Sequence, residues 1–239
     1  LKTKMIAING AIVLGIAAVI SAEISMFLSH QYEELEETTM GFADIVNEAV
    51  QAQFFERYGD VQAFAMNPQV RSRSGSEIAA ALDGYVALYG IYDLVIVADA
   101  TGRVVGVNTK DPSGKDIPTH RLLGRSVANT PWFKNVMAGR FTEDKEKNFF
   151  GTFVEEVGID PYVSEIYGEK RIGIGFSAAL KDETGKVIGV VSNRAGSRWF
   201  EVELESAVTA VVSADFHHPR FSIFNERGLL LAEVATDAS

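Results

Sequence analysis

The chain has 239 residues, a formal charge of −10 at neutral pH and no cysteine. The missing cysteine excludes disulfides, cysteine-ligated zinc and thiol catalysis, and the acidic charge argues against nucleic acid as a partner, because phosphates require clustered Lys and Arg. With 47% apolar residues, the chain is a folded protein, long enough beyond its first helix for one large domain or two small ones.

The first element is an almost uninterrupted apolar run over residues 5–28. As a helix rising ~1.5 Å per residue it would span about 30 Å, the thickness of a hydrocarbon core, so the sequence predicts a transmembrane helix within residues 1–30. Lys2 and Lys4 precede the run and glutamates follow it at residues 33–37. This bias predicts an N-terminus in the cytoplasm and a remainder outside the inner (cell) membrane, periplasmic or extracellular. A cleaved signal peptide is the alternative, because small residues lie near the end of the run.

A one-sided apolar stripe follows over residues 31–68. Apolar residues recur every three, four or seven positions from Leu35 to Phe64, with acidic and amide residues between them, and Pro68 forbids continuation. The pattern predicts one long exposed helix that continues from the membrane segment. The stripe packs either on its own domain or on a second copy of the chain, since the repeat is too mixed for a strict heptad seam.

Helix and hairpin signals come next. Ser74 and Glu77 have the spacing of a capping box, which predicts a helix to about Tyr89. Residues 92–107 predict two strands around an Asp-Ala-Thr-Gly turn, and residues 171–193 repeat the pattern around Asp-Glu-Thr-Gly.

A loop, two further helices and a last pair of strands are predicted in the rest of the chain. A polar loop covers residues 109–125, and Pro131 suits the first turn of a short helix. Residues 198–212 are predicted to be helical. Residues 221–234 again read as strand, turn and strand, which predicts the start of a second module that is cut short in this chain.

In this order, the elements resemble the double Cache sensor domain of bacterial chemoreceptors, the methyl-accepting chemotaxis proteins, and of some sensor kinases. The segments that carry the resemblance are YDLVIVADATGRVVGVN, TPWFKNVMAG and DPYVSEIYGEKRIGIGFSAALKDETGKVIGVVSNR. The resemblance implies an α+β fold, with a transmembrane helix, a long N-terminal helix and PAS-like antiparallel sheet modules. It places a membrane-distal ligand-binding module at residues 69–212 and the start of a membrane-proximal module at residues 213–239.

The resemblance also implies a function. The chain is expected to be the extracytoplasmic sensor domain of a transmembrane chemoreceptor that binds a small polar metabolite, forms a parallel homodimer through the long helix and signals across the membrane. No enzymatic activity and no cofactor are expected. The sensor domain of a membrane histidine kinase or cyclase is the alternative, and a membrane-tethered enzyme or scaffold subunit is a further one.

The ligand class follows from two positions in the family pattern. Amino-acid-binding members resemble one another in an arginine two positions before the Trp of a W-[FY] pair and in an aspartate on the last strand. Here Thr130 and Arg194 stand in those places. The resemblance therefore favours a carboxylate ligand, and an amino acid stays open.

Five residues are predicted to bind the ligand: Arg125, Trp132, Asp160, Tyr162 and Arg194. Guanidinium forks suit a carboxylate, and Trp132 would be a lid aromatic. The alternatives are structural. The arginines could form surface salt bridges to Glu155, Glu156 or Glu201, the tryptophan could fill the core, and Asp160 could begin an ordinary turn before proline.

No catalytic or metal-binding residue is predicted. His217 and His218 are of a ligand type, but adjacent residues do not share a face in an extended segment and no carboxylate cluster is spaced to complete a shell. A nucleophile elbow and a phosphate loop are also missing from the sequence.

Overall fold

The computed structural model describes residues 2–72, 74–146, 148–213 and 220–235. Within these ranges it describes the backbone alone for residues 2–18, 203, 207 and 210–213. The chain forms two compact units, Leu1–Asn47 and Glu48–Ser239. Helix α1 (Lys2–Met66) accounts for the described part of the first unit and continues into the second. The predicted long helix is thus confirmed, and it ends before Pro68 as the proline rule requires.

No helical segment within the described residues combines the length and hydropathy needed to cross a membrane. The transmembrane helix expected within residues 1–30 is therefore not confirmed by the structure.

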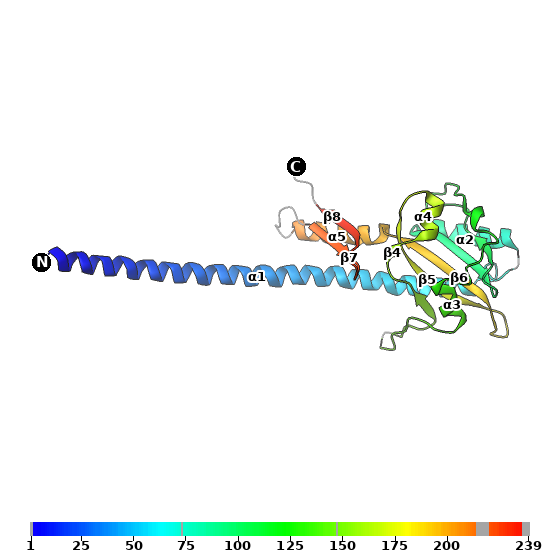
Figure 1. Cartoon of the computed structure of the whole chain (residues 1–239), viewed down its shortest axis with the longest axis horizontal. Coiled ribbons are helices and arrows are strands. Elements are labelled where there is room, and N and C mark those ends of the chain that lie inside the picture. Colours follow the sequence, from blue (N-terminus) through cyan, green and yellow to red (C-terminus); the bar gives the residue numbers. More distant parts are fainter. Residues whose placement is uncertain (1, 73, 147, 214–219, 236–239) are drawn as a thin grey trace. The chain divides into compact units, whose positions relative to one another are not determined.

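An antiparallel sheet lies at the centre of the second unit (Figure 1). Its strand order is β2-β1-β6-β5-β3, and β4 also pairs with β5. The strands are β1 (Tyr92–Asp99), β2 (Val104–Val107), β3 (Thr152–Val154), β4 (Gly158–Ile159), β5 (Ile172–Lys181) and β6 (Val187–Gly196). Both predicted hairpins are confirmed, and β6 joins them by pairing with β1 as well as with β5.

Helices cover both faces of this sheet. Helix α2 (Gly75–Tyr89) is capped by Ser74 as predicted, and it ends at Gly90, whose φ of 70° suits a residue without a side chain. The opposite face carries η1 (Thr119–Leu122), α3 (Pro131–Met137) and α4 (Pro161–Tyr167). The predicted helix at Pro131 is confirmed, whereas α4 was not predicted.

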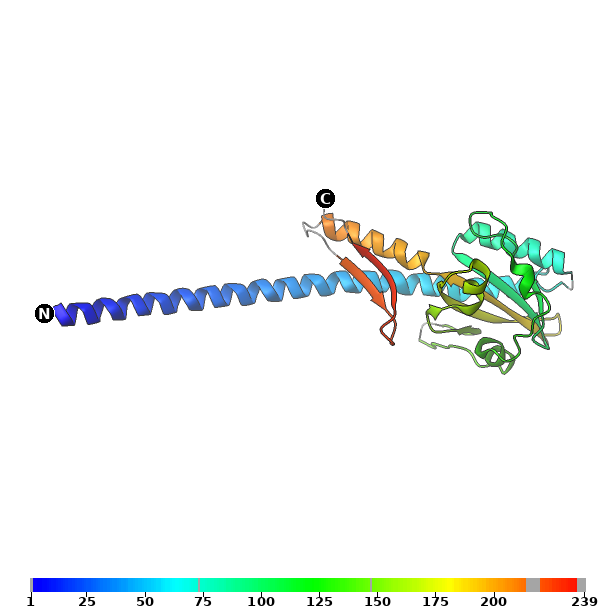
Figure 2. The same cartoon turned by 45° about the horizontal axis from the view of Figure 1, so that its top comes forward.

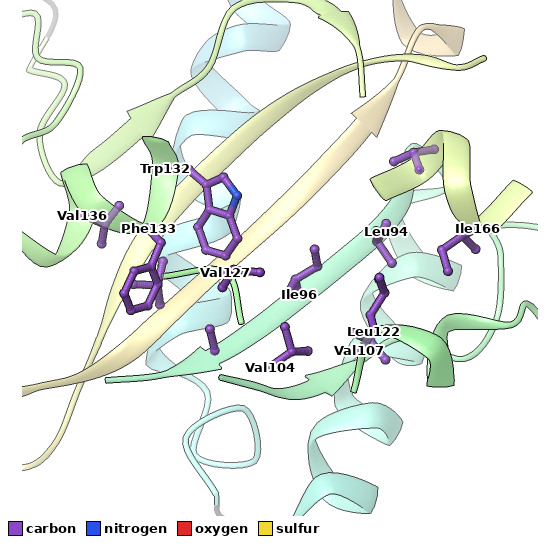
Figure 3. Packing of buried hydrophobic residues seen from close by; sticks show 13 residues of the cluster. Leu94, Ile96, Val104, Val107, Leu122, Val127, Trp132, Phe133, Val136 and Ile166 are labelled. Carbon is purple, nitrogen blue, oxygen red and sulfur yellow. The ribbon is translucent and has the colours of Figure 1, made fainter. Parts of the chain in front are cut away.

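The apolar core lies between the sheet and the helices α3 and α4 (Figure 3). Its buried residues come from β1, β2, β6, the two helices and the loop between β2 and α3: Leu94, Ile96, Ala98, Val104, Val107, Leu122, Val127, Trp132, Phe133, Val136, Val163, Ile166 and Val190. On the other face, Phe64 of α1 stacks on Tyr85 of α2 at 3.9 Å between ring centroids. The short helices are held mainly by this burial, since helices of seven residues are marginal alone.

A second, smaller sheet follows the last helix. Helix α5 (Arg198–Ser213) contacts β8, and β7 (Arg220–Phe224) pairs with β8 (Leu230–Ala235) in an antiparallel hairpin (Figure 2). The expected strand, turn and strand over residues 221–234 is confirmed. The histidines at positions 217 and 218 lie outside the described residues.

One turn design recurs four times in the described part of the chain. A side-chain Oδ1 accepts hydrogen bonds of 2.8–3.1 Å from the N–H groups two and four residues later, and a glycine with positive φ completes the turn. The residues that accept are Asp99, Asp111, Asp182 and Asn225. The repeated turn pattern of the sequence therefore reflects one hydrogen-bonded turn structure.

Candidate ligand-binding pocket

A cavity of about 210 Å³ lies on the face of the sheet that carries α3 and α4. It is bounded by the first residues of these two helices and by β4, β5 and β6. Four of the five predicted residues line it, namely Trp132, Asp160, Tyr162 and Arg194. The volume is below the ~300–1,000 Å³ of drug-sized pockets, so the cavity suits a small molecule.

Two glycines on β5 create the hollow above the sheet. Gly173 and Gly175 both line the cavity and carry no side chain that could fill it. The Glu155 N–H donates to the Gly175 carbonyl at 2.9 Å, and Gly175 lies directly opposite Arg194 on β6. A Cβ at position 175 would collide with both the Arg194 guanidinium and the Glu155 carboxylate. Glycine therefore lets the charged side chains of Arg194, on β6, and of Glu155, just after β3, meet across β5.

The guanidinium of Arg194 is held from one side only. Its Nη1 forms an ion pair with Glu155 and lies 3.4 Å from Oδ2 of Asp160, while the side chain is only 4% exposed. Its Nε and Nη2 have no hydrogen-bond partner among the described residues. The ring centroid of Trp132 lies 5.4 Å from the guanidinium carbon, within the range of a cation–π contact. One edge of the fork is thus left with unused donors.

Asp160 positions helix α4 and one side of the cavity. Its Oδ1 accepts hydrogen bonds from the N–H groups of Tyr162 at 2.8 Å and Val163 at 2.9 Å, so it is the N-cap of the helix. The alternative of an ordinary turn at this position is corrected, because proline here occupies the first helical turn. The second oxygen remains for Arg194.

Tyr162 and Trp132 add the aromatic walls. Burial, as the largest cause, raises the pKa of Tyr162 despite the nearby charge of Arg194, so its hydroxyl stays protonated at neutral pH. Trp132 is buried, belongs to the core and also lines the cavity. Its position is therefore compatible both with a lid over the ligand and with a residue that fills the core. Its indole N–H has no partner among the described residues.

Arg125 lies outside this cavity. Its Nη1 donates to both carboxylate oxygens of Glu165 at 2.8 Å, and the side chain is 45% exposed. The structure therefore does not bring Arg125 together with the other four residues. The salt-bridge alternative describes its position, with a different glutamate from those considered.

The sequence did not assign Glu155, Glu156 or the two glycines to the pocket, although all of them line it. The alternation of glycine in the run Ile-Gly-Ile-Gly at the start of β5 was the available signal, because it removes the side chains from one face of these four residues. Three carboxylates and one guanidinium line the cavity, a formal charge of −2. The pocket is thus more acidic than expected from the sequence, which predicted two arginines in it.

A larger cavity of about 700 Å³ lies elsewhere in the second unit, lined by residues near the start of β1, the end of α4 and the start of α5. None of the predicted residues lines it. Its central charges satisfy each other, since Arg171 lies 3.4 Å from Asp93 and stacks over the ring of Tyr167 at 3.8 Å. Within the described residues, no group of three or more His, Asp or Glu is placed to hold a metal ion.

No protein-family model matches the chain, and no curated protein matches its sequence. The fold is similar to that of solved sensor domains. The sensor domain of the V. cholerae histidine kinase DctB is 12% identical, with a TM-score of 0.54 over 72% of this chain and 60% of that domain. The Campylobacter jejuni chemoreceptor Tlp3 in complex with L-valine is 16% identical, with a TM-score of 0.53 over 84% of this chain and 72% of that domain.

The Tlp3 sensory domain with isoleucine bound is similarly related, with 16% identity and a TM-score of 0.54 over 84% of this chain and 71% of that domain. The chain spans 60% of the length of the kinase sensor domain that it resembles. The chain therefore has the fold of the sensor domains of chemoreceptors and of a sensor histidine kinase, and the recognised resemblance to the double Cache sensor fold is confirmed.

Proposed function

We propose that the chain is the extracytoplasmic sensor domain of a bacterial transmembrane chemoreceptor and that it binds a small polar metabolite in the cavity between Trp132 and Arg194. The observation that carries this proposal is a set of buried, unused donors. Nε and Nη2 of Arg194 and the indole N–H of Trp132 have no partner among the described residues. A buried donor without a partner costs about 1–3 kcal/mol, so unpaired donors on residues that line a cavity favour a ligand that supplies acceptors.

The donors favour a ligand that carries a carboxylate. An arginine fork binds a carboxylate through two parallel hydrogen bonds, and the free Nε and Nη2 form such an edge. An amino acid remains the second ligand class, because the acidic side chains of the pocket would suit its ammonium group. The Tlp3 domain was solved with L-valine and with isoleucine, which supports a small-molecule ligand for this fold.

The membrane topology and the assembly form part of the same proposal. The apolar run over residues 5–28, with Lys2 and Lys4 before it, would anchor the chain in the inner membrane and leave the second unit outside. A parallel homodimer would form along α1, and ligand binding would shift the balance between two arrangements of these helices.

A histidine kinase is the second candidate for the whole protein. The TM-score with the DctB sensor domain, 0.54, is close to the 0.53 with Tlp3, and an outside domain does not determine the output domain. Reading the coding sequence beyond Ser239 separates the two candidates. A chemoreceptor requires a second membrane helix and a long signalling coiled coil, whereas a kinase requires a catalytic domain.

A thermal-shift screen of carboxylates and amino acids tests ligand binding. At 100 times its dissociation constant, a ligand adds about 2.7 kcal/mol to the free energy of unfolding, which is roughly 5–10 °C in melting temperature for a domain of this size. We expect Arg194→Ala to abolish the shift, because its buried guanidinium lines the cavity.

The matched control is Arg125→Ala, which removes an arginine that lies outside the cavity. This variant should retain the full shift. Loss of the shift in both variants, or in neither, would count against binding at this cavity, and the melting temperatures without ligand show whether each variant is folded.

A further inference from the structure

Two paired strand positions and the segment after β3 bring an acid of this chain to the proposed ligand-binding arginine. The segment after β3 hydrogen-bonds to β5 through the Glu155 N–H and the Gly175 carbonyl, at 2.9 Å. Gly175 in turn lies opposite Arg194 in the register of β5 and β6. Because the central position has no side chain, the Glu155 carboxylate reaches over it to Nη1 of Arg194. The backbone hydrogen bond thus fixes the position of Glu155 beside β5, and the missing side chain at Gly175 allows its carboxylate to contact Arg194.

The two partners of this ion pair differ in burial. The side chain of Arg194 is 4% exposed, whereas that of Glu155 is 23% exposed. Rotation of the glutamate can therefore move its carboxylate into water, while the guanidinium has no comparable way out. A charged group leaves a pair at lower cost toward water than toward a buried site. The glutamate is consequently the partner that can be exchanged.

We propose that Glu155 determines the charge specificity of the pocket by acting as an internal carboxylate that competes with carboxylate ligands for Arg194. This inference rests on the proposed function of the cavity and adds the residue that sets its selectivity. While Glu155 is paired, the charge of Arg194 is already neutralised and Asp160 adds a second carboxylate 3.4 Å from Nη1. An entering anion then meets excess negative charge, whereas a ligand with an ammonium group meets none of this repulsion.

The proposal predicts a gain of binding rather than a loss. Replacement Glu155→Gln keeps the size and one acceptor oxygen but removes the negative charge beside Arg194. Ligands that carry only carboxylate charge should bind more tightly to this variant, because they no longer meet the like charge of Glu155 beside Arg194. A glutamate that only held Arg194 in place would give the opposite result, because loss of its support would weaken carboxylate binding.

Isothermal titration calorimetry on the whole chain tests the inference. The probes are acetate and succinate, with methylammonium and 1,4-butanediammonium as matched cations. We expect Glu155→Gln to bind at least one of the two carboxylates about tenfold more tightly than the wild type, and to bind the cations no more tightly.

The control is Glu165→Gln, which removes the glutamate of the other arginine pair, Arg125 and Glu165. This pair lies outside the cavity, so the control should bind the probes like the wild type. Any general effect of lowering the negative charge of the chain would appear in both variants, and it would then overturn the assignment to Glu155.

The remaining outcomes are distinct. Equal or weaker carboxylate binding by Glu155→Gln, when the wild type binds these probes, overturns the specificity role and leaves the sensor function standing. Binding of no probe by either protein overturns the specificity role, whereas the thermal-shift screen of carboxylates and amino acids decides on the proposed function itself.

Discussion

At the scale of single residues, one glycine decides whether the pocket has its charge pair. Gly175 is buried on β5, and the guanidinium of Arg194 and the carboxylate of Glu155 occupy the space that a side chain would need. The same absence of a Cβ leaves room for the cavity. The identity of this residue therefore links strand register to the chemistry of the site.

We expect Gly175→Ala to destabilise the chain by about 1–3 kcal/mol, because its methyl group collides with two charged side chains at once. Chemical denaturation measures the change. Gly84→Ala is the matched control, since Gly84 lies in α2 and a methyl group at this position would meet no atom within 4 Å. This control should stabilise the helix by about 0.5–1 kcal/mol. Equal effects of the two substitutions would show that crowding at position 175 is unimportant.

At the scale of elements, the hairpins depend on a repeated hydrogen-bonded turn. The hydroxyl of Thr184 donates to Asp182, and this bond, as the largest cause, lowers the pKa of Asp182 together with the N–H groups of Lys186 and Thr184. A lowered pKa in the folded state means that ionisation of this aspartate favours folding. That contribution is complete above the unfolded-state pKa of about 3.9 and is lost as the pH falls through the lower folded value.

Replacement Asp182→Asn tests this turn. The amide keeps an acceptor, as Asn225 does in the fourth turn, but it does not ionise. The wild type should therefore be more stable than the variant above about pH 5, and the difference should shrink as the pH falls below the unfolded-state pKa of about 3.9. Urea denaturation across this pH range measures it. A stability difference that persists unchanged at low pH would assign the effect to geometry instead of charge.

The elements that the sequence predicted are those with local signals. Alternation and the turn pattern identified both hairpins, and proline identified the end of α1 and the start of α3. Strands β3 and β4 were missed, because three and two residues are too short to show a period. Helix α4 was missed because an aspartate before proline begins turns as well as helices.

The pocket could be predicted only in part for a different reason. Trp132, Asp160, Tyr162 and Arg194 were identified through the family resemblance, and the structure brings them to one cavity. A salt bridge from Arg194 to Glu155 was one of the alternatives from the sequence, and the structure forms it. Its burial depends on how β6, β5 and the segment after β3 are aligned, which no local pattern encodes. Arg125 was included because arginine suits a carboxylate, but its loop directs it to Glu165.

At the scale of the whole molecule, the fold supplies two units with different roles in the proposed sensor. The first unit is a helix whose described residues expose large apolar side chains, and Tyr32, Leu35, Met40 and Ile45 lie among them. Such a surface suits the proposed second copy of the chain. The second unit contains the sheet, the core and the cavity, so the proposed ligand recognition belongs to this unit.

The central claim is that a small ligand binds beside Trp132, and tryptophan fluorescence tests it most directly. The chain has two tryptophans, and Trp199 packs on Phe54 and Phe200 and does not line the cavity. Replacement Trp199→Phe therefore leaves one reporter at the site. Titration of this variant with a ligand found by thermal shift should change the emission of Trp132 with the same dissociation constant as the shift. A full thermal shift with unchanged emission would contradict binding at this pocket.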